Sequence, residues 1–232
     1  DRLILKGGTA LSKVWRAIRR FSEDVDVSLS RKWLGFTGKL DPEQATSASQ
    51  RKKQLESLVT ACEAKVRDEL RPALAARMST ALGDSGWMLE SDPGDAQCLI
   101  FRYPPVFAEA SEAPYISRSV KIEGGARTDA WPTEDRTTQP CAAAAFPSGV
   151  PDAPVSVRVL SIERRFWEKA TILHAEARHR KEKPTPARYS RHYADLAALA
   201  DHQAGQRAMQ RDDLRARVAM HKQVFFADKF AS

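Results

Sequence analysis

A glycine pair near the start of the chain, placed between two short apolar stretches, is the feature that most restricts the fold. Residues 3–6 predict a β-strand, and Gly7 and Gly8 follow it immediately. Residues 9–20 repeat apolar side chains at helical spacing, and residues 25–29 predict a second strand. Because glycine lacks a Cβ atom, the backbone N–H groups of such a turn can approach a phosphate closely.

Two aspartates stand at the second predicted strand. Asp24 and Asp26 have one apolar residue between them, so on a strand both side chains point to the same face. Such a pair is an open oxygen site for Mg²⁺, or for Mn²⁺, which keeps its other positions for water and substrate phosphates. Alone, the pair is equally typical of surface acids at a strand end. Together with the glycine turn it favours nucleotidyl transfer.

A third carboxylate, Glu123, ends a strand predicted over residues 116–123. On a strand adjacent to Asp24 and Asp26 it could face the same metal, or accept the proton of an attacking hydroxyl. The alternative is an ordinary acid at a strand end before two glycines, and the sequence does not decide between them.

Two later residues on predicted helices are further candidates. Lys169 could reach the β- or γ-phosphate of a nucleoside triphosphate as a point charge, although a solvated lysine is the commoner interpretation of its spacing. Asp195 could serve catalysis, or it could simply pair with Arg191 one turn earlier. His192 could act as a base or a stacking group, but a single helical histidine is more often structural.

The rest of the chain predicts an α/β (α+β) protein. Residues 1–150 read as the α/β core and residues 151–232 as a mainly helical part that completes the site. The core contains a long helix broken near Pro72, a hairpin turning at residues 92–95 and a loop over 124–154. Residues 155–160 are one more strand or a covering segment. Helices are expected over residues 162–180, 189–203 and 208–226.

Composition narrows the functional classes. The formal net charge is +7, and residues 158–191 hold ten Lys/Arg against four Glu, which suits an anionic partner such as a nucleotide or RNA, or only a solvated face. Cys62, Cys98 and Cys141 are scattered without metal-ligand spacing, which favours a reducing cytoplasm. No apolar run approaches the roughly 20 residues that a membrane helix needs, so we expect no membrane association.

Several stretches, taken together and in order, resemble the AbiEii/AbiGii-type nucleotidyltransferase toxins. The resemblance runs from about residue 3 to about residue 200. The stretches that carry it are residues 6–13, 20–27, 120–123, 159–171 and 188–196. It implies a DNA polymerase β-like nucleotidyltransferase core with a mixed or antiparallel sheet, followed by a helical part.

The resemblance also implies roles for individual residues. Asp24 and Asp26 would bind Mg²⁺, Lys169 would touch phosphate, and Asp195 would be the last motif residue. Glu123 matches the third carboxylate of the wider superfamily. The residues implied near the nucleotide are Gly7, Gly8, Thr9, Ser12, Lys13 and Ser22.

By the same resemblance, we expect Mg²⁺-dependent transfer of a nucleoside monophosphate from a nucleoside triphosphate (NTP) to an acceptor hydroxyl, with RNA or tRNA as acceptor. The chain would act as the toxin of a toxin–antitoxin or phage-defence module with a cognate antitoxin. The alternatives are transfer to a protein or small molecule, and a catalytically silent nucleotide- or RNA-binding module. Family members usually carry a helical segment before the first strand, so we expect an N-terminal segment to be missing here.

Overall fold

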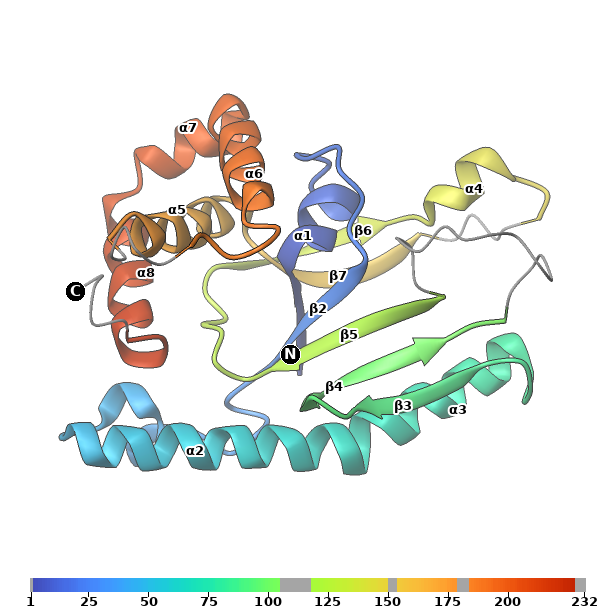
Figure 1. Ribbon diagram of the computed structural model, residues 1–232, viewed down its shortest axis with the longest axis horizontal. Coiled ribbons are helices and arrows are strands. Elements are labelled where there is room, and N and C mark those ends of the chain that lie inside the picture. Colours follow the sequence, from blue (N-terminus) through green and yellow to red (C-terminus); the bar gives the residue numbers. More distant parts are fainter. Residues whose placement is uncertain (1, 105–117, 150–153, 179–183, 228–232) are drawn as a thin grey trace.

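The computed structural model describes residues 2–104, 118–149, 154–178 and 184–227. Within these ranges, seven strands form one mixed sheet in the order β3-β4-β5-β2-β1-β7-β6 (Figure 1). The strands are β1 (Leu3–Lys6), β2 (Asp24–Leu29), β3 (Met88–Asp92), β4 (Asp95–Arg102), β5 (Ser119–Gly125), β6 (Thr133–Thr138) and β7 (Val155–Leu160). The helices are α1 (Gly7–Thr9), α2 (Ala48–Lys65), α3 (Arg71–Leu82), α4 (Cys141–Ala145), α5 (Ile162–Arg178), α6 (Ser190–Asp201), α7 (Gln203–Met209) and α8 (Asp212–Phe225).

The strand pairing explains how distant parts of the chain meet. β1 is antiparallel to β2 and parallel to β7, and β2 is parallel to β5. β3, β4 and β5 form the antiparallel meander that the sequence predicted, with the hairpin turn between Asp92 and Asp95. Residues 155–160, left open as a strand or a covering segment, are an interior strand of the sheet, between β1 and β6. The α/β fold class with a helical C-terminal part is confirmed.

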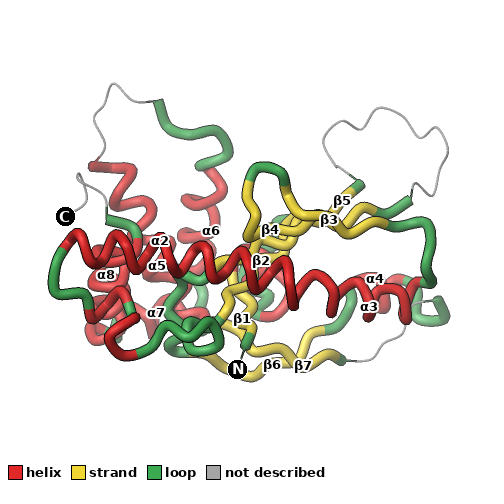
Figure 2. Tube along the Cα trace, turned by 90° about the horizontal axis from the view of Figure 1, so that it is seen from below, coloured by secondary structure: helices red, strands yellow, loops and turns green. Residues whose placement is uncertain are grey.

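One face of the sheet is closed by a single long helical run. α2, a π-helical segment (Val66–Leu70) and α3 follow one another without a loop and cross the underside of the sheet (Figure 2). Pro72 lies at the start of α3, where its missing N–H group interrupts the regular hydrogen bonds, so the break expected there is a widened turn. Leu58 and Val66 pack here against Leu29 and Leu99 of the sheet, in the larger buried core.

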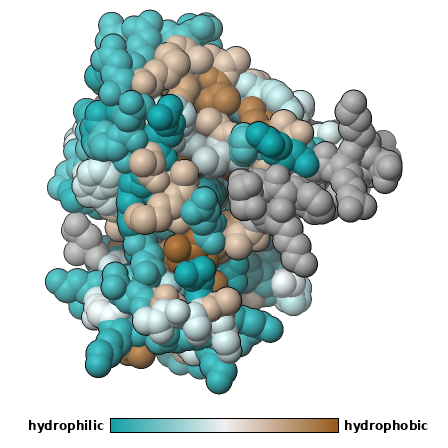
Figure 3. Space-filling model, turned by 90° about the vertical axis from the view of Figure 1, so that its left-hand side faces the viewer, coloured by the Kyte–Doolittle hydropathy of each residue, from teal (hydrophilic) through white to brown (hydrophobic). Residues whose placement is uncertain are grey.

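The C-terminal helices gather at one end of the sheet and pack on the segment that follows the glycine turn (Figure 1). Leu11 and Ile18 lie in one buried cluster with Ile162 and Phe166 of α5 and Leu199 of α6. This cluster fixes α5 and α6 beside the glycine turn. The surface on this side is mainly hydrophilic, with smaller apolar areas between the polar ones (Figure 3).

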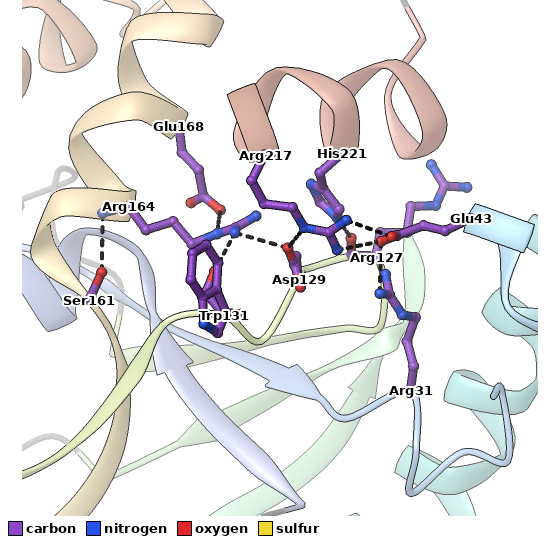
Figure 4. Close-up of polar contacts among 10 residues, drawn as sticks. All are labelled: Arg31, Glu43, Arg127, Asp129, Trp131, Ser161, Arg164, Glu168, Arg217 and His221. Carbon is purple, nitrogen blue, oxygen red and sulfur yellow. Dashed lines mark hydrogen bonds and ion pairs between the residues drawn. The ribbon is translucent and has the colours of Figure 1, made fainter. Parts of the chain in front are cut away.

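A buried polar network holds α5 against α8 (Figure 4). Arg164 of α5, fully buried, donates to Glu168 at 3.1 Å and to Asp129 at 3.0 Å. Arg217 of α8 bonds the same Asp129 at 2.7 Å and reaches Glu43 at 2.7 and 2.8 Å. Buried charges are stable only when they are paired in this way. The network therefore fixes the position of α5.

The first predicted helix is shorter than expected. Residues 9–20 were predicted as one helix, whereas α1 and a π-helical segment (Ala10–Val14) end it at Val14. Arg16 has a left-handed backbone with φ of 53°, which an α-helix does not allow. The chain then runs without regular structure to β2, and this places Arg20 beside the glycine turn.

The loop predicted over residues 124–154 is wrong in part, because it contains β6 and α4. β6 pairs with β7 at the edge of the sheet and consists of threonines and charged residues. An edge strand of this composition avoids pairing with other chains but has no apolar alternation to reveal it. Residues 150–153 lie outside the described residues, as do residues 116 and 117 of the strand expected over 116–123.

The C-terminal helices also differ in their bounds. The single helix expected over residues 208–226 is two helices, α7 and α8, because Arg211 leaves the helical conformation and Asp212 and Asp213 open a new first turn. α7 packs closely on α6, since a Cβ atom at Gly205 would lie 1.9 Å from the Leu199 carbonyl oxygen. Residues 179 and 180, expected at the end of α5, lie outside the described residues.

In the described part of the chain, no helix is long and apolar enough to cross a membrane. The three cysteines are all free; Cys62 and Cys98 are buried, and Cys141 is exposed.

Candidate active site

The predicted carboxylates share one face of two neighbouring strands, β2 and β5, and Lys6 of β1 lies beside them. Lys6 of β1 lies directly opposite Asp26 of β2, and Asp26 lies directly opposite Glu123 of β5. Residues that are directly opposite in a sheet project to the same side. Asp24, two residues before Asp26, therefore projects to this side as well, away from the long helical run. The Lys6 ammonium is 3.7 Å from the Asp26 carboxylate.

Asp26 lies immediately over the glycine turn. A Cβ atom at Gly7 would stand 1.6 Å from the Asp26 Oδ2 atom, and Gly7 has φ of +75°. A Cβ atom at Gly8 would stand 2.8 Å from Arg20 Nη2 and 2.9 Å from Ser22 Oγ. The turn therefore meets a carboxylate on one side and a guanidinium and a hydroxyl on the other, and a side chain at Gly7 would displace Asp26.

A cavity of about 420 Å³ opens over this turn. Its walls differ in charge. The strand side contributes Glu23, Asp24, Asp26 and Glu123. The remaining lining residues are Gly7, Gly8, Phe21 and Ser22, the cations Arg20, Arg165, Lys169, Arg188 and Arg191, and also Ser190 and His192. A cavity with carboxylates on one wall and cations on the other suits a polyphosphate that is bound together with metal ions.

The carboxylates are crowded enough to disturb one another. Burial raises the pKa of Asp24 above its usual value, and the nearby charges of Asp26 and Glu23 raise it further. Burial, followed by Asp26 and Asp24, raises the pKa of Glu123. Like charges held close together in a half-buried site disfavour the ionised form. A bound cation would relieve this repulsion.

Lys169 and Asp195 meet on the opposite wall. Their side chains form an ion pair of 2.7 Å, and both residues are buried, with exposed fractions of 3 % and 1 %. Burial, followed by Arg165, lowers the pKa of Lys169, whereas Asp195 raises it. Lys169 Nζ also lies 3.3 Å from His192 Nδ1. Burial, followed by Lys169 and Arg191, lowers the pKa of His192 to about 4, so this histidine is neutral at pH 7.

Arg20 is a site residue that the sequence reasoning missed. Its Nε and Nη2 atoms bind the two carboxylate oxygens of Asp195 at 2.7 and 2.8 Å. The partners are 175 residues apart, so no local pattern could pair them. One signal in the sequence could have indicated Arg20. It stands four residues before Asp24, in the stretch 20–27 that carries the family resemblance. Arg165 and Arg188 were likewise counted only as part of a basic stretch. Arg191 was also considered as a partner of Asp195, but Asp195 pairs instead with Arg20 and Lys169.

Three residues expected near the nucleotide are not among those that line the cavity. Thr9 donates its hydroxyl to the backbone carbonyl of Asp24, which ties the glycine turn to β2. Ser12 donates to the Thr9 carbonyl at 3.3 Å. Lys13 extends toward α4, where its ammonium is 2.9 Å from Cys141 Sγ. Asp195 does not line the cavity either, and reaches it through Lys169 and Arg20.

Within the described ranges, no three His, Cys, Asp or Glu side chains are grouped closely enough to hold a metal ion on their own. Asp24, Asp26 and Glu123 therefore share the cavity without forming a closed three-ligand site. Mg²⁺ is typically held by one or two carboxylates together with substrate phosphates and water. The metal-binding roles of the three carboxylates stay predictions.

The family described as nucleotidyl transferase AbiEii toxin, type IV toxin–antitoxin system, matches residues 1–231. The match includes both walls of the cavity. Comparison with curated proteins and with solved structures gives no match. The family match confirms the resemblance seen in the sequence. The chain therefore belongs to the AbiEii family of nucleotidyl transferase toxins of type IV toxin–antitoxin systems.

Proposed function

We propose that this nucleotidyltransferase moves a nucleoside monophosphate from an NTP to a hydroxyl of RNA, with Mg²⁺ as cofactor and pyrophosphate as the second product. The observation that carries the proposal is the contact between Asp26 and Gly7, where a Cβ atom would come within 1.6 Å of the carboxylate. It brings the paired carboxylates and the glycine turn to one point of the cavity.

The residues present fit a divalent metal ion. Asp24, Asp26 and Glu123 offer only oxygen ligands, and their mutual repulsion raises the pKa of Asp24 and Glu123 in addition to burial. Asp24 and Asp26 would hold Mg²⁺, with Glu123 as a further ligand or as a base. When bound, Mg²⁺ would lower the pKa of the acceptor hydroxyl and neutralise charge on the phosphates.

The residues of the chain supply positioning and charge. Gly7 and Gly8 admit the triphosphate close to the backbone, and Lys169 faces it as a cation. The acceptor oxygen bonds to the α-phosphorus while the bond from that phosphorus to the β-bridging oxygen breaks, and the electron pair leaves with pyrophosphate. Glu123, whose pKa is raised, would accept the proton of the acceptor hydroxyl if it acts as the base. Such catalysis depends mainly on orientation and electrostatics.

The positive charge of several residues that line the cavity supports a nucleic-acid acceptor. Arg188 and Arg191 lie at the lining of the cavity and belong to the basic stretch of the sequence. Arg188 also forms an ion pair of 3.0 Å with Glu23, beside the paired aspartates. Phosphate backbones are attracted by such a surface without regard to sequence. The type IV toxin–antitoxin family further supports a cognate antitoxin as partner.

The test is an incubation of the purified protein with each labelled NTP, Mg²⁺ and total RNA. We expect label to enter RNA and pyrophosphate to be released, and we expect both to be lost in Asp24→Asn and Asp26→Asn. Asp68→Asn, which changes an exposed carboxylate of the long helical run, is the matched control and should keep activity. Transfer that continues in both site variants would refute the proposal.

A further inference from the structure

We infer that Arg20 binds the pyrophosphate portion of the NTP, and that Asp195 is a positioning residue that holds Arg20 and Lys169 in place for this purpose. The inference rests on the proposed function and assigns Arg20, together with Lys169, to the leaving group. It also gives the catalytic role expected for Asp195 a specific form, which is to support the two residues that contact the substrate.

The guanidinium of Arg20 is held in one orientation. Two of its five N–H groups bind the two oxygens of Asp195, and a third, on Nη1, donates to the Phe21 carbonyl at 3.1 Å. Among the described residues, no hydrogen-bond partner occupies the other two N–H groups of Arg20. The side chain is 29 % exposed and lines the cavity. Arg20 can thus keep its grip on Asp195 and still donate to a ligand.

The location of this guanidinium matches a phosphate and not a base. Its Nη2 atom would be 2.8 Å from a Cβ atom at Gly8, so it stands directly over the glycine turn. Lys169 reaches the same carboxylate from α5, and the two cations therefore share Asp195 between them. A planar guanidinium and a nearby ammonium are suited to the oxygens of a diphosphate.

The opposite wall explains why fixed cations are needed there. Asp24, Asp26 and Glu123 repel phosphate oxygens wherever a metal ion does not lie between them. As the bond to the α-phosphorus breaks, negative charge grows on the departing pyrophosphate. Preorganised cations at that position stabilise the transition state without having to reorient. Arg20, fixed by Asp195, meets this requirement.

Asp195 makes its contribution indirectly. Only 1 % of it is exposed, it does not line the cavity, and its two oxygens are taken by Arg20 and Lys169. Hydrogen bonds from Arg20 and Lys169 outweigh the effect of burial and lower the pKa of Asp195, so it stays ionised at pH 7. It is therefore a permanent counter-charge for the two cations.

Calorimetric binding in the presence of Mg²⁺ tests the contact of Arg20. We expect Arg20→Ala to weaken the binding of inorganic pyrophosphate and of NTP at least about tenfold, the loss of one charged hydrogen bond. Binding of the nucleoside monophosphate should change less than about twofold. Arg19→Ala, a change of the exposed neighbour, is the control and should leave all three affinities unchanged.

Two results would overturn the contact. One is Arg20→Ala binding pyrophosphate as well as the wild type does. The other is an equal loss for the monophosphate and the triphosphate. Either result leaves the proposed function standing if the wild type still transfers label to RNA. Absence of transfer by the wild type instead removes the proposed function, so the two failures are distinguishable.

The pH profile tests the positioning role of Asp195. The groups around Lys169 are Arg165 of α5, Asp195 and His192 of α6, and Arg20 of the preceding loop. Asp195→Asn removes the charge that raises the pKa of Lys169, so activity should be lost at lower pH on the alkaline side. An alkaline limb that does not move, with only the overall rate reduced, would contradict this role.

A double variant completes the test. If Asp195 acts through Arg20 and Lys169, Arg20→Ala combined with Asp195→Asn should lose less activity than the product of the two single losses. Full multiplicativity would show that Asp195 acts elsewhere. Thermal unfolding is followed for each variant. The binding comparison for Arg20→Ala, which leaves Asp195 paired with Lys169, decides the pyrophosphate contact even if Asp195→Asn fails to fold.

Discussion

At residue 7 of the chain, two separate constraints require glycine. The backbone is left-handed there, with φ of +75°, and the Asp26 carboxylate fills the space that a side chain would take. The first constraint concerns stability, because other residues rarely adopt that conformation. The second concerns the site, because any displacement of Asp26 moves one of the paired carboxylates. The two constraints can be separated by comparison with another glycine.

Gly7→Ala should therefore lower the transfer rate by at least about a hundredfold, as expected when a reacting group is displaced by about 1 Å. Gly35→Ala is the matched control, since Gly35 has φ of +82° but nothing within 4 Å of its would-be Cβ atom. Both variants should lose about 1 kcal/mol of stability from the backbone strain. The measurements are initial rates and thermal unfolding. Equal rates for the two variants would show that the contact with Asp26 has no catalytic role.

At the scale of elements, α5 joins the cation wall to the interior of the protein. It carries Lys169 on the cavity side and, one residue earlier, Glu168 in the buried polar network (Figure 4). Burial alone would raise the pKa of Glu168, but Arg165, Arg164 and Lys222 lower it to about 2. Arg164, in turn, reaches the loop before β6 through Asp129 and Trp131. The position of Lys169 thus depends on ion pairs among Arg164, Glu168 and Asp129, none of which lines the cavity.

Glu168→Gln should lower the free energy of unfolding by about 3 kcal/mol, because, among the described residues, it leaves the buried Arg164 with only one of its two counter-charges and Arg165 with none. Glu163→Gln on the same helix is the control. Its partner Arg207 is exposed, so we expect a loss below about 1 kcal/mol. Chemical denaturation of both variants at pH 7 measures the difference. Similar losses in the two would show that the buried network adds little.

The ion pairs of Glu168 also predict how the stability of the protein depends on pH. A carboxyl with a lowered pKa in the folded state contributes stability that is complete above its unfolded pKa, about 4.3. That contribution is lost as the pH falls toward 2. His221, with its pKa lowered to about 4 by burial first of all, adds a loss that begins below about pH 6.5. Denaturation curves between pH 7 and pH 3 should show stability falling more steeply in the wild type than in Glu168→Gln.

Across the whole molecule, the long helical run closes one face of the sheet, and the site lies on the other. The proposed RNA acceptor would therefore approach from the side of Arg188 and Arg191. Arg191→Gln should weaken RNA binding about equally for all sequences and reduce the salt dependence of binding by about one unit of slope. Arg77→Gln, on α3 at the closed face, is the control and should do neither. Titrations of both variants with RNA at several salt concentrations measure the affinity and its salt dependence.

Much of the molecule was predictable because its core elements have apolar periodicity. β1, β2 and the β3–β4 hairpin all show this periodicity. The shared face of Asp24 and Asp26 followed from their separation by two positions along a strand. β6 was missed because an edge strand needs no apolar face, and the first helix was overestimated because Arg16 adopts an uncommon backbone conformation. Arg20 was missed because its partner, Asp195, is brought near only by the folded helices. Local sequence patterns therefore predicted the carboxylates on the strands better than the cations on the opposite side of the cavity.

The position of β7 beside β1 has a consequence for synthesis. The sheet is joined there by a strand from the second half of the chain, and Lys169 and Asp195 follow that strand. While the polypeptide is still being made, the glycine turn, Arg20 and the paired aspartates emerge before Lys169 and Asp195. We therefore expect a nascent chain that stops before Lys169 to lack transferase activity.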